Sequence, residues 1–279
     1  MADMPLAVPD ARRSSPLPTA ADIDRALLRA AARPRTLPGI DLREPEQLRL
    51  LDELLPFYSD LDLENSASPG RFDLANTWFT YADAVFLALM MRRFRPRRVI
   101  EVGSGFSTAL MLDINERFLG NTVDISTIDP DPSRLSELLV GEDMESLLID
   151  SVVQDVPLAR FDSLRANDIL CIDSSHVVKA GSDVQFLLDD VLPRLAGGVL
   201  IHFHDVFYPF EYPEYWLRDG VAMNEAYAVR TLLNSSSRYR IRLFTDFLLT
   251  FHHERLAATM PLTVRRPFPT GGIWLEVSD

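Results

Sequence analysis

Residues 99–108 read Val99-Ile100-Glu101-Val102-Gly103-Ser104-Gly105-Phe106-Ser107-Thr108, and this stretch decides the fold. Its first four residues have the composition of a buried strand, and a helical pattern begins after the second glycine. A strand joined to a helix by a glycine loop brings backbone amides close to a ligand at the helix N-terminus. We therefore expect a ligand-binding crevice beside Gly103, Ser104 and Gly105.

Two features of this loop concern the charge of the ligand. The dinucleotide-binding pattern has a third glycine where Thr108 stands, which disfavours NAD. Glu101 lies just before the first glycine, where a pyrophosphate would gain little from added negative charge. An acid in this position therefore indicates a cationic ligand.

From Arg98 onward, short apolar runs of strand length alternate with helical patterns. Repeated strand-helix-strand units indicate an α/β fold, Rossmann-like and doubly wound, with a mostly parallel sheet covered on both faces. The expected strands are Val99–Val102, Val123–Ile128, Leu147–Val153, Ile169–Ile172, Val199–Phe203, Tyr239–Phe244 and Gly272–Val277. The expected helices between them are Ser107–Phe118, Pro132–Leu139, Pro157–Leu164, Ser182–Leu195, Asn224–Asn234 and Phe247–Ala258.

The residues before this region divide into two parts. Residues 1–20 are rich in Pro, Ala, Arg and Ser without hydrophobic period, which is typical of a mobile terminus. Residues 21–95 predict a helical extension with helices at Asp22–Ala32, Glu46–Leu55 and Trp78–Phe94. This extension is either a lid over the ligand or a contact between copies of the chain, and a homo-oligomer stays open. Residues 96–279 form the expected main domain.

The composition excludes several classes of protein. The formal net charge of −13 opposes binding to nucleic acid or to an anionic membrane surface. The single Cys171 rules out an internal disulfide, and no apolar run reaches the roughly 20 residues of a membrane helix. The first residues lack the pattern of a signal peptide, so we expect a cytoplasmic protein.

Polar residues follow the second and third expected strands. Asp129 can accept hydrogen bonds from both hydroxyls of a ribose, whereas Asp131 is expected to cap the helix that begins at Pro132. The third strand runs into Gln154 and Asp155, a pair that could reach an adenine amino group. Taken alone, Asp155 is equally a loop residue.

The segments EVGSGFST, TIDPD and ILCIDSSH, in this order and spacing, resemble the class I S-adenosylmethionine-dependent methyltransferases. The resemblance covers about residues 98–277 and implies a seven-stranded sheet whose last strand lies antiparallel between the fifth and sixth. It implies cofactor-binding roles for Glu101, Gly103, Ser104, Gly105, Asp129, Asp155 and Asp173, with Asp129 on the ribose and Asp155 on the adenine.

A second polar cluster follows the fourth and fifth strands. It consists of Asp173, His176, His204 and Asp205, which a parallel sheet brings to the same edge as the cofactor. Asp173, His204 and Asp205 are residue types that bind a divalent metal, which polarises an acceptor oxygen. His176 is then available as a general base.

This cluster also resembles the metal-dependent sugar O-methyltransferases of macrolide and aminocoumarin biosynthesis and the cephalosporin-hydroxylase-like proteins. In that group, an aspartate after the fourth strand and an acidic pair after the fifth bind magnesium. His204 departs from the pattern, since a nitrogen ligand suits manganese, iron or zinc better than magnesium. Two other interpretations stay open, a polar pocket without metal and a site without a catalytic role.

The expected function is methyl transfer from S-adenosylmethionine to an oxygen of a small-molecule acceptor, such as a sugar or a secondary metabolite. Metal-independent methylation of nitrogen or carbon and a non-catalytic cofactor-binding module are the alternatives. The aromatic segment 205–216 is either an acceptor pocket or a loop packed on the sheet edge. Lys179, the single lysine, is expected at the surface beside the pocket.

Overall fold

The computed structural model describes residues 15, 17–63, 70–79, 81–141, 144–265 and 269–278. Most of the mobile terminus expected for residues 1–20 lies outside these residues. The strands are β1 (Arg98–Val102), β2 (Asp124–Ile128), β3 (Leu148–Ile149), β4 (Ile169–Ile172), β5 (Leu200–His204), β6 (Tyr239–Phe244) and β7 (Gly272–Val277).

The strands form one 7-stranded sheet in the order β3-β2-β1-β4-β5-β7-β6. Strands β1 to β5 pair in parallel, and β7 is antiparallel to both β5 and β6. This confirms the expected α/β fold and the position of the last strand. Because Val102 pairs with both Ile128 and Ile172, the carboxyl ends of β1, β2 and β4 lie level at one edge of the sheet.

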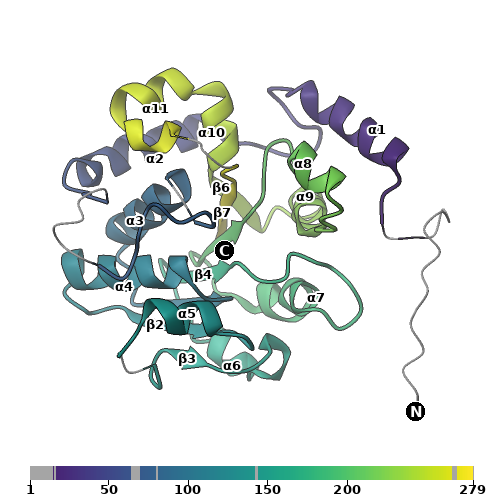
Figure 1. Ribbon diagram of the computed structural model, residues 1–279. Helices are drawn as coiled ribbons and strands as arrows, with labels where there is room; N and C mark the ends of the chain where they lie inside the picture. The colour runs from purple at the N-terminus through teal and green to yellow at the C-terminus, as the bar shows by residue number, and fades with distance from the viewer. Residues whose placement is uncertain are drawn as a thin grey trace, which may run out of the picture.

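Helices flank the sheet on both sides (Figure 1). All residues of β4 and β5 are buried, as expected for central strands covered on two faces. The α-helices are α1 (Ala20–Ala31), α2 (Glu44–Tyr58), α3 (Ala82–Phe94), α4 (Phe106–Phe118), α5 (Ser133–Leu138), α6 (Leu158–Phe161), α7 (Asp183–Phe186), α8 (Glu214–Arg218), α9 (Glu225–Ser235), α10 (Thr245–Phe251) and α11 (His253–Thr259).

Several expected elements differ from the structure. The single helix expected over Phe247–Ala258 is divided at His252 into α10 and α11. Helix α3 begins at Ala82 rather than Trp78, because the Asn76 side chain accepts hydrogen bonds from the backbone of Trp78 and Phe79 and holds a turn there. The helix expected over Ser182–Leu195 is α7 followed by a π turn and a 3₁₀ turn that contains Pro193, which cannot donate a backbone hydrogen bond. The strand expected over Leu147–Val153 shortens to β3, a sheet edge with one neighbour.

The first helices are joined to the sheet in different ways. Gln47 of α2 is buried, and its side chain accepts a hydrogen bond from the Phe244 backbone at 2.8 Å and donates one to Leu42 at 2.6 Å. Helix α3 has 11 buried residues among its 13. Helix α1, by contrast, packs beside α8 at the side of the molecule, and only Ile23 of it is buried (Figure 1).

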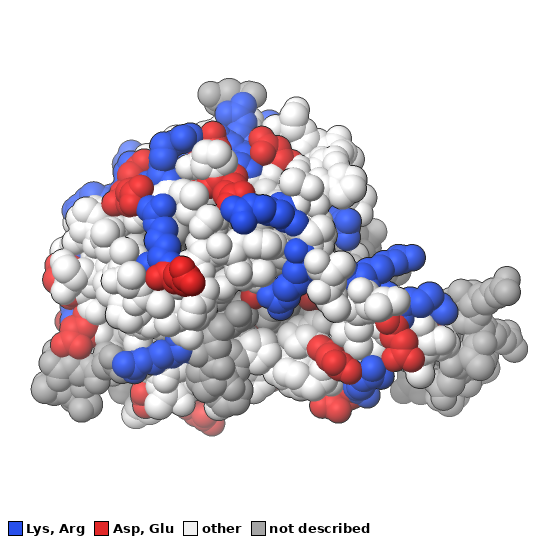
Figure 2. All heavy atoms as spheres, turned by 90° about the horizontal axis from the view of Figure 1, so that it is seen from above, with Lys and Arg blue, Asp and Glu red and all other residues white. Residues whose placement is uncertain are grey.

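On the side of the molecule where α2, α10 and α11 lie, basic and acidic side chains stand next to each other on the surface (Figure 2). Helix α2 forms ion pairs with its neighbours, Asp52 with Arg255 of α11 and Glu53 with Arg93 of α3, the latter at 2.6 Å. Among the described residues, no helix combines the length and the apolar character that crossing a membrane requires.

Candidate active site

The loop between β1 and α4 lies against the end of β4. Gly103 has φ of +94°, and a Cβ atom there would lie 1.9 Å from the carbonyl oxygen of Asp173. Only glycine combines this backbone conformation with so close an approach of another chain segment. The sequence therefore brings the predicted cofactor loop and the second polar cluster into direct contact.

Glu101 lies beneath this loop and does not line a cavity. Its side chain is fully buried, and its two carboxylate oxygens accept hydrogen bonds from Ser107, at 2.5 Å, and from Thr108. Burial raises the pKa of Glu101 to about 8, although both hydroxyls oppose this. In the structure the carboxyl group holds the N-terminal turn of α4 in place, and its role in cofactor binding stays a prediction.

A cavity of about 610 Å³ opens at the carboxyl edge of the sheet, within the usual range of small-molecule sites. Its walls come from the ends of β1, β2, β4 and β5 and from the loops around them. The lining residues that the sequence had singled out are Gly103, Ser104, Asp129, Asp131, Gln154, Asp173, His176, Lys179, His204 and Asp205.

At one end of the cavity, Asp129 accepts a hydrogen bond from the Ser104 hydroxyl at 2.6 Å. Its other oxygen accepts from the Asp131 backbone at 2.9 Å. The Asp131 side chain makes no cap hydrogen bond to α5, so the expected cap is absent from the described structure. Gly105, expected to contact the cofactor, does not line the cavity, and its N–H donates to Thr108 at 3.0 Å.

Of the two polar residues in the 3₁₀ turn after β3, Gln154 lines the cavity and Asp155 does not. Asp155 is exposed and lies outside the cavity wall, which does not support its predicted contact with adenine. Gln154 does line the cavity, and its amide nitrogen donates to the Gly181 carbonyl at 2.8 Å. Its buried amide oxygen has no hydrogen-bond partner among the described residues, so it can accept one from a ligand.

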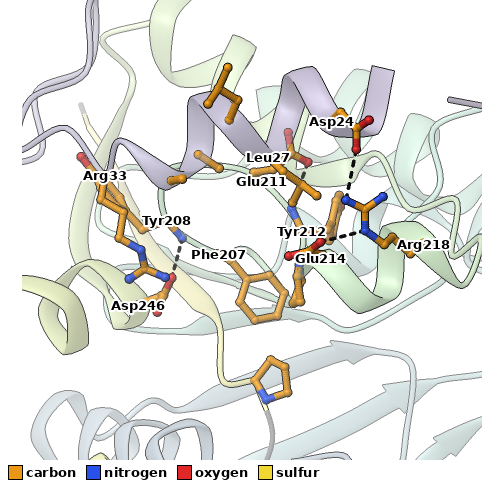
Figure 3. A pocket seen from close by; sticks show the side chains of 15 residues that line it. Asp24, Leu27, Arg33, Phe207, Tyr208, Glu211, Tyr212, Glu214, Arg218 and Asp246 are labelled. Carbon is orange, nitrogen blue, oxygen red and sulfur yellow. Dashed lines mark hydrogen bonds and ion pairs between the residues drawn. The ribbon is translucent and has the colours of Figure 1, made fainter. Parts of the chain in front are cut away.

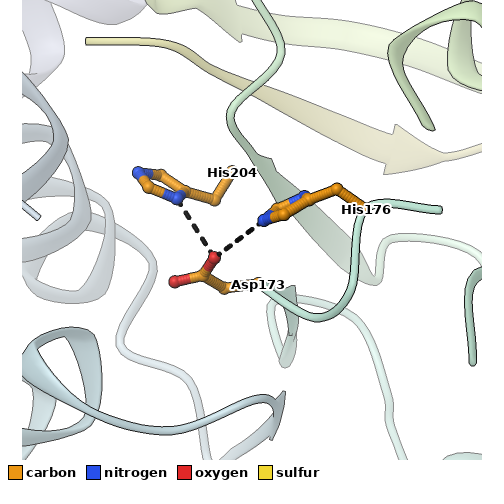
Figure 4. Close-up of side chains that lie close together, drawn as sticks. All are labelled: Asp173, His176 and His204. Atoms are coloured by element: carbon orange, nitrogen blue, oxygen red, sulfur yellow. Dashed lines mark hydrogen bonds and ion pairs between the residues drawn. The ribbon is translucent and has the colours of Figure 1, made fainter. Parts of the chain in front are cut away.

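At the other end, Asp173, His176 and His204 converge (Figure 4). One oxygen of Asp173 lies 3.3 Å from Nε2 of His176 and 3.1 Å from Nδ1 of His204. Asp205 is more distant: its Oδ2 lies 3.8 Å from Nε2 of His176 and 3.8 Å from Nδ1 of His204. The structure thus brings together all four residues of the predicted cluster.

Two buried acids that we did not predict complete this cluster. Glu225, at the start of α9, lies 2.9 Å from Nδ1 of His176, and Asp83, at the start of α3, lies 3.7 Å from Nε2 of His204. Asp83 is the only charged residue in the apolar stretch from Trp78 to Met91, which was a usable sequence signal. Glu225 carried no comparable signal, since acids are common in the first turn of a helix.

The carboxylates control the protonation of both histidines. Burial disfavours the charged form of His176, but its hydrogen bonds to Asp173 and Glu225 outweigh this and raise its pKa to about 10. Burial also opposes the charge of His204, yet Asp205 and Asp173 raise its pKa well above the usual value. With a carboxylate at each nitrogen and no metal bound, His176 holds a proton on both nitrogens, so this geometry does not support the predicted general base.

The backbone is unusual at two of these residues. His176 has φ of 56° and Asp205 has φ of 54°, both in the left-handed region that residues other than glycine seldom occupy. Such a conformation costs about 1–3 kcal/mol and is concentrated at functional sites. Two of the described residues with this conformation therefore lie in the cluster.

His202 and the aromatic segment have structural roles. His202 is buried and stacks on Trp274 at 4.4 Å, and burial lowers its pKa to about 3. Tyr208 packs against Phe244 and Phe247, so the segment 205–216 is mainly a packed loop rather than an acceptor pocket. Its outer side lines a separate cavity of about 790 Å³ against α1 (Figure 3).

The described histidines outside this region include His252. It is half-buried, and its Nε2 lies 2.7 Å from Glu44 of α2. Lys179 is exposed at the rim of the cavity, as expected.

Comparison with known families gives one match. Residues 100–206 match the model of a methyltransferase domain family. A curated protein of Archaeoglobus fulgidus, described only as uncharacterized, is 34% identical over 136 residues, which cover 47% of this chain and 61% of that protein. The chain thus spans less than two thirds of the length of this relative.

Solved structures with a similar fold share little sequence. A methyltransferase of Podospora anserina bound to S-adenosylhomocysteine is 16% identical, covers 95% of this chain and 99% of its own, and has a TM-score of 0.42. The O-methyltransferase TomG of Streptomyces achromogenes, in complex with S-adenosylmethionine, is 15% identical, covers 92% and 96%, and also has a TM-score of 0.42.

Proposed function

We propose, on the premise that residues 100–206 form a class I methyltransferase domain, that this protein transfers a methyl group from S-adenosylmethionine to an oxygen of a small molecule. The observation that carries the proposal is that one cavity, of about 610 Å³, joins the predicted cofactor loop to the polar cluster. It is lined by Gly103, Ser104 and Asp129 at one end and by Asp173 and His204 at the other.

The cofactor fits the polar groups at the first end. Asp129 retains lone pairs that can accept hydrogen bonds from ribose hydroxyls, and the Gln154 amide oxygen can accept one from the adenine amino group. The positive sulfonium would then lie toward the carboxylates at the other end, where an opposite charge stabilises it. Glu101 would support this arrangement by fixing the loop.

The acceptor hydroxyl would lie at the Asp205 end of the cavity. Methyl transfer is an in-line displacement, so the residues must align the hydroxyl with the sulfonium and receive its proton. Asp205 lines the cavity, and its 3.8 Å separations from the imidazoles are longer than hydrogen bonds. Its carboxylate can therefore accept the proton that His176 cannot.

The residue types at this end also fit a divalent metal. Asp173, His176 and His204 each offer a ligand atom, and these atoms all lie within 4.8 Å of one another. When bound, a metal would act as a Lewis acid on the acceptor oxygen and lower the pKa of its hydroxyl.

Binding and turnover test the proposal separately. Titration calorimetry should detect S-adenosylmethionine and S-adenosylhomocysteine binding and no NAD binding; NAD binding alone would contradict the proposal. A panel of hydroxylated small molecules, incubated with cofactor labelled on the methyl group, should then yield an alkali-stable methyl ether. Products methylated only on nitrogen or carbon would support the alternative reaction, and cofactor binding without any product would support a non-catalytic module.

A further inference from the structure

Each imidazole of the cluster lies between Asp173, which faces both rings, and a second acid that faces only that ring. His176 turns Nε2 toward Asp173 and Nδ1 toward Glu225, at 3.3 and 2.9 Å. His204 turns Nδ1 toward the same oxygen of Asp173, at 3.1 Å, and Nε2 toward Asp83, at 3.7 Å. The two rings thus use opposite nitrogens to achieve the same arrangement.

The buried atoms around the cluster are incompletely paired. Nε2 of His204 and one carboxylate oxygen each of Asp83 and Glu225 have no hydrogen-bond partner among the described residues. Asp83, His204 and Glu225 are no more than 5% exposed, so water from the surface does not satisfy these atoms. Burying several acids and two imidazoles costs free energy unless opposite charges held close to them offset it.

This arrangement is the usual environment of a metal-binding histidine. Such a histidine presents one nitrogen to the metal and donates the N–H of the other to a carboxylate, which fixes the tautomer and the orientation of the ring. Two histidines and one carboxylate with open positions suit first-row transition metals, whereas magnesium prefers oxygen ligands. His176 matches that description, because Nδ1 lies at hydrogen-bond distance from Glu225 while Nε2 faces Asp173. In His204, Nε2 faces Asp83 at 3.7 Å without a hydrogen bond, and Nδ1 faces Asp173.

We propose that Asp173, His176 and His204 bind a transition-metal ion of the zinc, manganese or iron(II) class, and that Glu225 and Asp83 orient the two imidazoles for it. The proposal deepens the proposed function and rests on it for the role of the metal, but not for binding of the metal. It replaces the predicted ligand set, in which Asp205 was a ligand and His176 was free. Asp205 stays at the cavity side of the centre as a hydrogen-bond acceptor for the substrate.

Metal affinity tests the ligands directly. The full chain is stripped with a chelator, and Co²⁺, Zn²⁺ and Mg²⁺ are titrated separately against a chromophoric competitor. We expect Co²⁺ and Zn²⁺ to bind with a stoichiometry of one and far more tightly than Mg²⁺. His176→Ala and His204→Ala should each weaken Co²⁺ binding by more than about 100-fold, because each removes a ligand. His253→Ala, an exposed histidine of α11, is the matched control and should bind Co²⁺ like the wild type.

The positioning acids are tested in the same titration. Glu225→Gln and Asp83→Asn should weaken Co²⁺ binding by about 10- to 100-fold, the usual effect of removing such a partner. Glu254→Gln, an exposed acid of α11, should leave it unchanged. Circular dichroism identifies any variant that fails to fold.

X-ray absorption of the Co²⁺-loaded wild type does not depend on any variant and should show two imidazole ligands. Fewer than two imidazoles, or unchanged Co²⁺ affinity in His176→Ala, would overturn the proposal. Equal preference for Mg²⁺, or no binding of Co²⁺ and Zn²⁺ below millimolar concentration, would also overturn it and leave a pair of imidazolium ions among carboxylates. Calorimetry of the stripped protein with S-adenosylmethionine separates the two proposals. If the cofactor binds but the metal does not, the methyltransferase assignment stands and the metal site is wrong. If the metal binds but the cofactor does not, the metal site stands and the methyltransferase assignment is wrong.

Discussion

Asp129 lies at the end of β2 with each carboxylate oxygen accepting one hydrogen bond, from Ser104 and from the Asp131 backbone. Asp129→Ala removes the expected acceptor of the ribose hydroxyls, and hydrogen bonds to a charged group contribute about 1.5–3 kcal/mol. We therefore expect S-adenosylmethionine binding to weaken by roughly 10- to 100-fold in titration calorimetry. The control is Asp124→Ala, an exposed acid at the other end of the same strand, which should bind the cofactor like the wild type. Equal affinity of both variants would remove Asp129 from the site.

Glu101 shows that a sequence pattern can locate a residue without defining which groups its side chain contacts. The position of an acid before the glycine loop is visible in the sequence, but the hydroxyls of Ser107 and Thr108 that occupy its carboxyl group become neighbours only when α4 forms. A sequence pattern thus locates the loop and leaves open which of its side chains reach the cavity. The same holds for Asp155, whose neighbour Gln154 takes the wall position.

The buried Glu101 also makes stability depend on pH. Its pKa is raised from 4.5 to about 8, so between these values the folded state keeps a proton that the unfolded state loses. Stability from this group is therefore greatest below pH 4.5 and falls as pH rises to 8, by at most about 1.4 kcal/mol per pH unit. Glu101→Gln lacks this loss, so its melting temperature relative to the wild type should rise steadily from pH 5 to pH 8 in thermal melts. Parallel pH profiles for the two proteins would contradict the assigned protonation.

At the scale of elements, the central strands were the most predictable. The expected bounds of β4, β6 and β7 agree with the structure, and those of β1, β2 and β5 differ by one residue. Five of these strands have neighbours on both sides, and β6, at the other edge of the sheet, alternates buried and more exposed residues at its start. The edge strand β3 and the broken helix at 183–194 were not predictable, because pairing with a single neighbour and the effect of Pro193 depend on the surrounding structure.

The candidate site was predictable only where strands end. Asp173 and His176 follow β4, His204 ends β5 and Asp205 follows it, and parallel pairing of the two strands brings these residues together. Asp83 and Glu225 reach the same point from the first turns of α3 and α9, which no sequence spacing connects. Helix packing, rather than local pattern, therefore decides the surroundings of the two histidines.

The turn before α3 gives a test of the helical extension. Trp78 is 62% exposed, lines the cavity, and has the Arg134 guanidinium carbon 4.1 Å from its ring centroid. If this turn covers the cofactor, Trp78→Ala should weaken S-adenosylmethionine binding by about 1 kcal/mol, close to fivefold. Tyr215→Ala, an exposed aromatic outside this cavity, is the control. An unchanged affinity together with a lower molecular mass in sedimentation would instead assign Trp78 to a subunit contact.

At the scale of the whole molecule, the three helices before β1 differ in how far they are buried against the rest of the protein. Helices α2 and α3 are bound into the structure, whereas α1 contributes one buried residue. His252 and Arg255 pair with Glu44 and Asp52 of α2, so α2 packs with the region between β6 and β7. A boundary near residue 95 therefore does not separate two independent folding units.

Gln47 tests this unity, since it joins α2 to the last part of the sheet through the Phe244 backbone. Gln47→Ala leaves that buried N–H without its partner, which costs about 1–3 kcal/mol. We expect a single calorimetric transition that shifts to lower temperature as a whole, because α2 and the sheet unfold together. Glu53→Ala, an exposed position of the same helix, should change stability by less than about 0.5 kcal/mol. A second, separate transition in Gln47→Ala, with the sheet melting at the temperature of the wild type, would show instead that the residues before β1 fold as a domain of their own.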